Sequence, residues 1–318
     1  MIISASRRTD IPAFYAEWFI NRIRERYLFV QNPFSIHRFK RVDLSLSNVD
    51  VIVFWTKNPE PMIEYLDELT ERRYRYYFQF TLTAYPRALE PDVPSVTTRL
   101  TTFKKLSEKI GREKVIWRFD PITFSSVTPE QRIIDDFGRL AKELHGAATR
   151  VVISFVDPYK TVQRNIKKLQ KEEDIQFYDA DRTMTQVQDV AATLAEVARA
   201  HSMEIVSCAE ELDLSSVGIG HGRCIDDRLV SRLFGIAVTG KKDPSQREEC
   251  QCVESQDIGQ YNTCTHGCVY CYANFNKAQA LKNRALHDPT SPFLVGHGAD
   301  KAGPNRGQLG LFVDDQPK

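Results

Sequence analysis

The chain has 318 residues and a formal net charge of +1 at pH 7, with 42% hydrophobic and 27% charged residues. These values are typical of a folded protein with a sizeable core, and the near-neutral charge does not by itself indicate binding to nucleic acid or to an anionic membrane. No apolar run approaches the roughly 20 residues of a membrane span, and the N-terminus lacks the apolar core of a signal peptide. We therefore expect a cytoplasmic protein that does not associate with a membrane.

Apolar runs rich in β-branched and aromatic residues alternate with helical patterns through the first two-thirds of the chain. These runs are 2–6, 49–56, 76–83, 114–119, 150–156 and 203–208. Their nearly continuous apolar character is typical of parallel strands that are covered on both faces. Strand–helix units joined by right-handed crossovers predict an α/β fold, a partial or complete TIM-like (β/α) barrel of parallel strands.

Helical patterns are clearest at three places between these runs. Residues 12–26 begin with a proline in the first turn and repeat apolar residues at helical spacing. Residues 128–131, Thr-Pro-Glu-Gln, predict a capping box at the start of another helix. Residues 182–201 carry an apolar stripe on one face. The charge-rich stretch 161–173 is expected to be an exposed helical face.

Polar residues follow or interrupt the apolar runs. They include Ser6, Arg7, Arg8, Thr9, Asp10, Lys57, Thr81, Thr83 and Arg118. The carboxyl ends of barrel strands form one rim, where active sites are built. Ordinary helix capping would account for Thr9 and Asp10 equally well. Arg118 and the Arg7-Arg8 pair lie in or beside apolar runs, so we expect for them either an anionic partner or a simple surface position.

A tight loop near the end of the chain places three of the seven cysteines, Cys264, Cys268 and Cys271, in a C-x-x-x-C-x-x-C spacing. Three thiolates can hold three irons of a [4Fe–4S] cube and leave the fourth iron free to chelate a cofactor. A zinc site is the alternative, because C-x-x-C also suits tetrahedral zinc and His266 in the same turn could supply the fourth ligand. Seven cysteines in a cytoplasmic chain favour metal or redox chemistry over disulfides.

This spacing, with aromatic Tyr270 directly before the last cysteine, resembles the signature of the radical S-adenosylmethionine (radical SAM) enzymes. The resemblance implies a catalytic [4Fe–4S] cluster, SAM as second cofactor and an electron donor such as flavodoxin or ferredoxin. Those enzymes usually carry the loop after the first strand, whereas here it comes last. A strand at 255–261 and a helix at 275–286 would form a β-loop-α unit around it. With this unit beside the N-terminal strand, the chain would be a circular permutation.

The strand-end motifs Thr-Asp-Ile-Pro, Trp-Thr-Lys-Asn-Pro, Phe-Thr-Leu-Thr and Arg-Phe-Asp-Pro-Ile resemble those of the spore photoproduct lyase branch of that superfamily. The likeness implies SAM contacts: Ser6, Thr9 and Asp10 near the amino group, Thr81 and Thr83 near the ribose, Arg118 near the carboxylate and Tyr270 near the adenine. Arg7, Arg8 and Lys57 are candidates for an anionic substrate or for the SAM carboxylate. Residues 1 to about 295 also resemble an uncharacterised prokaryotic family of unknown function.

The remaining four cysteines, Cys208, Cys224, Cys250 and Cys252, equal the number that a closed four-cysteine site needs. Glycines 218, 220 and 222 would let the backbone approach an inorganic core closely. We predict that these cysteines form a second metal site, an auxiliary [4Fe–4S] cluster or alternatively a structural zinc. Cys208 and Cys224 could instead be small buried residues.

The chain is accordingly divided into barrel units (1–207), a cysteine-containing insertion (208–254), the cluster-bearing unit (255–286) and an irregular tail (287–318). The leading hypothesis is a radical SAM-type enzyme with an unknown substrate, for which the DNA-repair likeness admits a nucleic acid. The alternative is a zinc- or iron–sulfur-stabilised nucleic-acid-binding or electron-transfer protein. The near-neutral charge disfavours nucleic-acid binding, since phosphate contacts normally leave a basic footprint.

Overall fold

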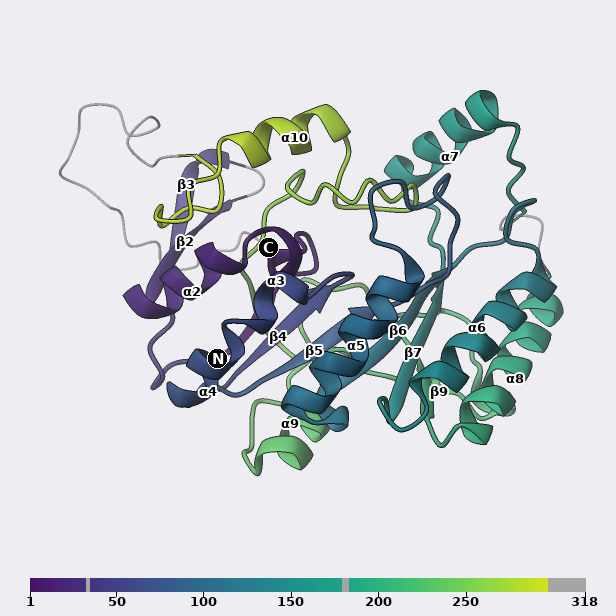
Figure 1. The fold of residues 1–318 in the computed structure, drawn as a ribbon, viewed down its shortest axis with the longest axis horizontal. Helices are drawn as coiled ribbons and strands as arrows, with labels where there is room; N and C mark the ends of the chain where they lie inside the picture. The colour runs from purple at the N-terminus through teal and green to yellow at the C-terminus, as the bar shows by residue number, and fades with distance from the viewer. Residues whose placement is uncertain (33–34, 179–182, 297–318) are drawn as a thin grey trace.

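The computed structural model describes residues 1–32, 35–178 and 183–296. Within them, eight strands form one parallel sheet in the order β10-β1-β4-β5-β6-β7-β8-β9 (Figure 1). These strands are β1 Ile2–Ala5, β4 Val51–Thr56, β5 Tyr76–Thr81, β6 Val115–Ile122, β7 Arg150–Phe155, β8 Glu204–Ser207, β9 Gly220–His221 and β10 Gln256–Asp257. The six predicted strands and the parallel α/β fold are confirmed. Because β10 and β9 are the edges of the sheet, closure into a complete barrel is not seen in this part of the chain.

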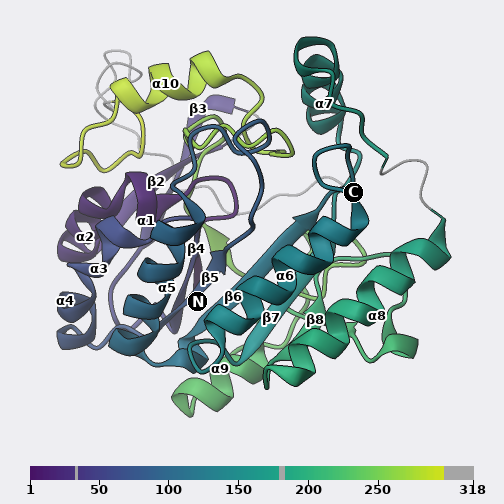
Figure 2. The ribbon, with the colours of Figure 1, turned by 45° about the vertical axis from the view of Figure 1, so that its right-hand side comes forward.

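The last strand, β10, lies beside the first. Gln256 pairs in parallel with Ile3, and Asp257 with Ser4. The cysteine loop that follows β10 therefore lies over the carboxyl ends of the strands (Figures 1 and 2). This confirms the predicted position of the last β-loop-α unit next to the N-terminal strand.

Two strands outside the main sheet were not predicted. They are β2 Tyr27–Asn32 and β3 Ser35–Asp43, which pair antiparallel. In β3, Lys40 and Arg41 are exposed and Val42 is buried. Strand β3 lacks the continuous apolar run that predicts the strands of the main sheet.

Helices occur where residues 12–26, 128–131, 161–173, 182–201 and 275–286 predicted them, with differences at their ends, and the helices between β4 and β6 were not predicted. The helices are α1 Ile11–Phe14, α2 Ala16–Glu25, α3 Glu60–Ile63, α4 Leu66–Glu71, α5 Val96–Ile110, α6 Glu130–Leu144, α7 Lys160–Glu173, α8 Met184–Ala200, α9 Asp227–Phe234 and α10 Lys277–Ala285. The helix expected at 12–26 is broken at Tyr15, whose φ and ψ are −137° and 26°. The predicted start of α8 at Arg182 lies outside the described residues. No helix in the described ranges is long and apolar enough to span a membrane.

The predicted capping box at Thr128 is wrong. The Thr128 hydroxyl donates to the Thr123 carbonyl at 2.9 Å and lies 2.6 Å from the Ser125 hydroxyl. Helix α6 has Pro129 as its N-cap and no side-chain cap. Threonine hydroxyls compete for nearby turn groups as well as for helix ends, and here the turn at Ser125 captures the side chain.

The strands bury side chains on both faces of the sheet. On one face, Phe54, Phe78 and Trp117 belong to a core shared with the helices. On the other, Tyr77 lies in a core with Cys224 and further residues of the segment 208–254. Figures 1 and 2 show α5 and α6 in front of the strands and α9 behind them. The cysteine-containing segment is thus the cover of the second face.

The described part of the tail, residues 287–296, docks on α2 and β2. The Trp18 indole donates to the Ser291 carbonyl at 2.9 Å, and the Phe29 amide donates to the Pro292 carbonyl at 2.9 Å. The Phe29 and Phe293 rings stack at a centroid distance of 5.1 Å. The remainder of the predicted tail, 297–318, lies outside the described residues.

The cysteine-containing segment approaches the sheet closely at Gly222. A Cβ at this position would lie 2.5 Å from Val206 Cγ2 and 2.9 Å from the Ser207 carbonyl. We expect Gly222→Ala to lower the free energy of unfolding by about 1 to 3 kcal/mol, measured by urea denaturation, because the added methyl overpacks the contact. The matched control is Gly220→Ala, where nothing lies within 4 Å of the added Cβ. A similar loss in both variants would contradict the prediction.

Candidate functional site

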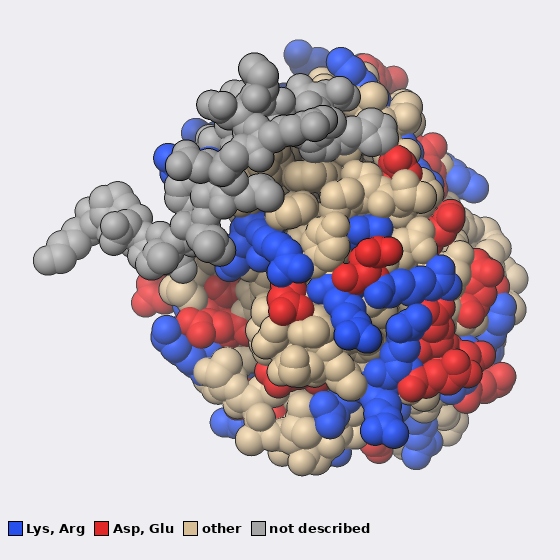
Figure 3. All heavy atoms as spheres, turned by 90° about the vertical axis from the view of Figure 1, so that its left-hand side faces the viewer, with Lys and Arg blue, Asp and Glu red and all other residues tan. Residues whose placement is uncertain are grey.

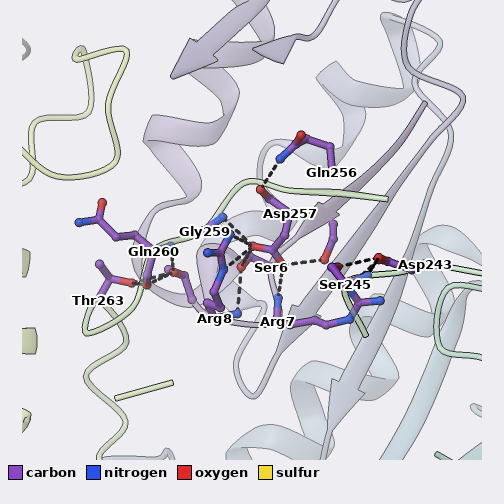
Figure 4. A network of polar contacts seen from close by, with 12 residues as sticks. Ser6, Arg7, Arg8, Asp243, Ser245, Gln256, Asp257, Gly259, Gln260 and Thr263 are labelled. Carbon is purple, nitrogen blue, oxygen red and sulfur yellow. Dashed lines mark hydrogen bonds and ion pairs between the residues drawn. The ribbon is translucent and has the colours of Figure 1, made fainter. Parts of the chain in front are cut away.

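Asp257, at the end of β10, joins the N-terminal strand to the cysteine loop (Figure 4). Its carboxylate accepts hydrogen bonds from Ser4 Oγ (3.0 Å), Ser6 Oγ (2.7 Å), Arg7 N (2.9 Å), Arg8 Nε (3.1 Å), Arg8 Nη2 (3.0 Å) and Gly259 N (3.0 Å). Burial opposes ionisation of this carboxyl, but Arg8, Ser6 and Arg7 outweigh it and lower its pKa. A charged Asp257 therefore fixes the turn after β1 against the base of the cysteine loop.

A second connection joins Thr9, in the segment after β1, to the start of the cysteine loop. The Thr9 hydroxyl donates to the Gln260 carbonyl at 2.9 Å and is 2.6 Å from the Thr263 hydroxyl. Gly259 makes this approach possible, because a Cβ there would lie 2.1 Å from Ser6 Oγ and 2.7 Å from Thr9 Oγ1. The segment after β1 thus holds the loop on the N-terminal side of Cys264.

The three motif cysteines are half-buried and lie near one another. Burial, with Asp10 and the two other thiols, raises the pKa of Cys264 well above its ordinary value. Burial also dominates at Cys268, whose pKa is raised to about 12. Burial thus keeps the thiols of Cys264 and Cys268 neutral without a metal, whereas a bound metal cation deprotonates the thiol that coordinates it. Three cysteine thiols in one loop are a donor set that iron–sulfur clusters and zinc both use.

A buried group of charges adjoins Cys268. Glu90 accepts hydrogen bonds from Lys57 Nζ at 2.8 Å, from the Thr83 hydroxyl at 2.7 Å and from the Tyr270 hydroxyl. Burial would raise the pKa of Glu90, but Lys57 and Arg99 outweigh burial and lower it to about 2. Glu90 is 2% exposed, so it is a charged, fully enclosed centre that orients Lys57 and Tyr270.

His266, inside the cysteine loop, is buried and paired with the N-terminal segment. Its Nε2 lies 2.8 Å from Asp10 Oδ2, and Asp10 also accepts the Lys57 amide at 2.7 Å and caps α1 through the Ala13 amide at 3.0 Å. The other ring nitrogen, Nδ1, is buried without a hydrogen-bond partner among the described residues. The ring of Phe14 packs on His266 at a centroid distance of 4.6 Å.

Most predicted SAM-contacting residues lie at this edge of the sheet, but their polar atoms already bond to protein groups. Ser6 bonds to Asp257, Thr9 to the cysteine loop, Asp10 to His266, and Thr83 and Tyr270 to Glu90. Thr81, the last residue of β5, is half-buried. Among the predicted substrate residues, Arg8 pairs with Asp257 and Lys57 with Glu90. The Arg7 guanidinium lies 4.0 Å from Asp243 and over the Trp55 ring, and its Nη2 is buried without a hydrogen-bond partner in the described part of the chain.

Arg118 lies at the other group of cysteines. Its guanidinium pairs with Asp120, and its Nη1 lies 2.6 Å from Cys224 Sγ. Cys224 Sγ is 3.0 Å from Cys208 Sγ. The Cys252 thiol also interacts with the thiols of Cys224 and Cys250. The four cysteines predicted to come together therefore do so. No set of three or more His, Cys, Asp or Glu side chains in the described ranges is already arranged around a point suited to a metal ion.

Two important residues, Asp257 and Glu90, were not predicted from the sequence, nor was the pairing of His266 with Asp10. Asp257 is the last residue of β10, so the rule that polar residues gather at strand ends could have found it. Glu90 lies in the loop after β5, away from any strand end, and only the fold brings it under Tyr270. The pairing of His266 with Asp10 spans 256 positions and has no local signal.

A family model described as "Domain of unknown function (DUF1848)" matches residues 2–273. The chain belongs to this family. All seven cysteines, from Cys208 to Cys271, lie within the matched range. No curated protein and no solved structure matches the chain. The expectation of a family of unknown function is confirmed, and it names no substrate.

Proposed function

We propose that the chain is a radical SAM-type enzyme that holds a [4Fe–4S] cluster on Cys264, Cys268 and Cys271. The supporting observation is the position of this three-cysteine loop at the carboxyl edge of a parallel sheet, beside the polar ends of β1, β4 and β5. Ligand sites of α/β sheets lie at this edge. When bound, the cluster would supply the electron that cleaves SAM to methionine and a 5′-deoxyadenosyl radical, which acts on the substrate.

The residues around the loop fix and shield this site. The Asn274 side chain donates to Cys271 Sγ at 3.3 Å. Hydrogen bonds to cluster sulfurs are one of the means by which proteins tune iron–sulfur centres. Lys57, held between Glu90 and the Tyr270 hydroxyl (2.8 and 3.0 Å), puts a fixed positive charge beside Cys268. These residues would orient the loop without taking part in bond cleavage.

The contacts revise the expected SAM and substrate residues within the proposal. Ser6, Thr9 and Asp10 would act as positioning residues, because their polar atoms bond to the cysteine segment or to His266. Arg118 would serve the second group of cysteines. The Arg7 guanidinium lies over the Trp55 ring and close to Cys252 and Cys250, so it too would serve the second group of cysteines.

Anaerobic turnover tests the proposal. Reconstituted protein would be reduced with dithionite and mixed with SAM, and 5′-deoxyadenosine would be measured by mass spectrometry, with iron and zinc determined on the same sample. We expect deoxyadenosine from the wild-type chain and from the control Thr265→Ser, which changes the same loop but no motif cysteine. Cys268→Ser should reduce it to background. Zinc-loaded, iron-free protein that does not cleave SAM would refute the proposal.

One observation favours a second candidate, a zinc-stabilised nucleic-acid-binding module. Metal-binding histidines usually place their other ring nitrogen on a carboxylate, as His266 does with Asp10 while Nδ1 lacks a partner in the described structure. Cys264, Cys268, Cys271 and His266 would then complete a tetrahedral zinc site. His266→Ala would cost zinc binding on this hypothesis, whereas a radical SAM site would keep its iron and still produce deoxyadenosine.

The surface gives little support to nucleic-acid binding. Figure 3 shows Lys and Arg side chains interspersed with Asp and Glu on the face toward α2 and α4. Some of these charges pair with each other, as Arg24 does with Glu68 at 2.6 Å. Proteins that bind phosphates concentrate basic residues on one face. The radical SAM proposal, with an electron donor such as flavodoxin or ferredoxin as partner, is therefore preferred.

A further inference from the structure

We infer that Cys208, Cys224, Cys250 and Cys252 form a second metal centre, a [4Fe–4S] cluster with four thiolate ligands, buried under the second face of the sheet. This centre does not depend on SAM chemistry at the first one. It would have no open iron, because four cysteines occupy all four corners of the cube. Its ligands come from the segment 208–254, which covers the second face of the sheet, and not from the loop after β10 that carries Cys264, Cys268 and Cys271.

The first argument is that separate parts of the chain bring these thiols together. Cys208 follows β8, Cys224 precedes α9, and Cys250 and Cys252 lie in the irregular stretch before β10. The sulfurs of Cys208 and Cys224 are 3.0 Å apart, and Cys250 and Cys252 are buried in the same core as Cys224. All seven cysteines are free thiols in the structure. Chance burial of small residues does not require four thiols to share one location.

The second argument is that the sheet fixes the backbone around these cysteines. The Tyr77 hydroxyl and the Gln79 amide both donate to the Cys224 carbonyl, at 2.7 and 2.8 Å. The Ile225 amide points at Cys252 Sγ at 3.4 Å. Both Tyr77 and Gln79 are almost fully buried. Second-shell hydrogen bonds of this kind hold ligands in place and tune a metal centre.

The third argument is charge. Arg118 is 4% exposed and reaches Cys224 Sγ, and Arg7 lies close enough to Cys252 and Cys250 to interact with them electrostatically. The two guanidiniums lie over the ring of Trp55, at 5.1 and 5.3 Å from its centroid. Buried cations require negative partners. Four thiolates around a doubly charged core leave two excess negative charges, which Arg7 would offset together with Arg118, although Arg118 also pairs with Asp120.

The chain with Cys264, Cys268 and Cys271 all changed to serine isolates the second centre. After anaerobic reconstitution with iron and sulfide, we expect about four irons and four sulfides per chain to remain. Adding Cys250→Ser and Cys252→Ser should reduce both counts to background. Unchanged counts after that addition, a single zinc in place of iron, or a metal-free chain with a Cys208–Cys224 disulfide would each overturn the inference. Loss of deoxyadenosine alone would concern only the first centre.

A second measurement leaves all four cysteines of the second centre in place. In the chain lacking the first three cysteines, Arg118→Gln should lower the reduction potential of the remaining cluster, followed by electron paramagnetic resonance, because a positive charge beside it is lost. The matched control is Arg150→Gln, which removes another buried arginine that pairs with Asp226 and Glu204 instead. Equal shifts in the two variants, or no shift in Arg118→Gln, would contradict the role given to Arg118.

Discussion

Asp257→Asn should destabilise the protein by about 1.5 to 3 kcal/mol, as the loss of charged hydrogen bonds at a part-buried site does. The amide keeps the size of the side chain but leaves Arg8 without its counter-charge, and it turns an NH2 group toward donors such as Ser6 Oγ and the Arg7 amide. Urea denaturation would give the loss in the free energy of unfolding. Iron retention at the first centre should fall as well, because Asp257 anchors the loop that carries Cys264.

The same substitution should flatten the acid side of the stability profile. The pKa of Asp257 is lowered from 3.8 in the folded chain, so its contribution is fully present above that value and is lost as the pH falls through the folded pKa. A wild-type chain should therefore lose more stability on acidification than Asp257→Asn.

Asp92→Asn is the matched control for Asp257→Asn. Asp92 pairs with Lys277 at 2.7 Å at the same side of the molecule, but the two side chains are 46% and 57% exposed. Exposed pairs contribute about 0 to 1 kcal/mol, so the control should change stability little. Equal losses of stability in Asp92→Asn and Asp257→Asn would show that the Asp257 carboxylate does not fix the turn after β1 against the cysteine loop.

The strand order could be predicted because it depends on local patterns. Continuous apolar runs marked the six long strands, and the residues after 255 were correctly expected beside the first strand. In the hairpin β2–β3, charged residues interrupt β3, and the short apolar run 27–30 in β2 was not recognised as a strand. The two-residue strand β9 was missed because Gly220 and His221 have neither apolar character nor strand propensity.

The residues of the site could be predicted in part. Spacing alone marked Cys264, Cys268 and Cys271, and counting suggested the second group of cysteines. Which cation faces which centre could not be predicted. Arg118 and Thr81 are paired neighbours on adjacent strands, yet the Arg118 side chain reaches Cys224 on the covered face. The direction of a side chain from a strand end depends on what covers each face, and the segment that covers this face has no regular pattern of its own.

Glu90→Gln should have an effect as large as Asp257→Asn. Glu90 is the shared partner of two buried cations, Lys57 at 2.8 Å and Arg99 at 3.4 Å, and glutamine would leave both without a counter-charge. Its pKa is lowered from 4.5 to about 2, which corresponds to about 3 kcal/mol of stability at neutral pH. The loss should be measured by urea denaturation at pH 7.

The pH dependence separates this electrostatic effect from a packing defect. The contribution of Glu90 is present above pH 4.5 and disappears as the pH falls toward about 2. Between pH 7 and pH 3 the wild-type chain should therefore lose about 2 kcal/mol more than Glu90→Gln. Glu60→Gln is the control, because Glu60 pairs with Lys105 while both side chains are about half exposed (46% and 53%). A difference between wild type and Glu90→Gln that stays constant from pH 7 to pH 3 would mean that glutamine disturbs packing, and that Glu90 is not the charged centre holding Lys57 and Tyr270 beside the cysteine loop.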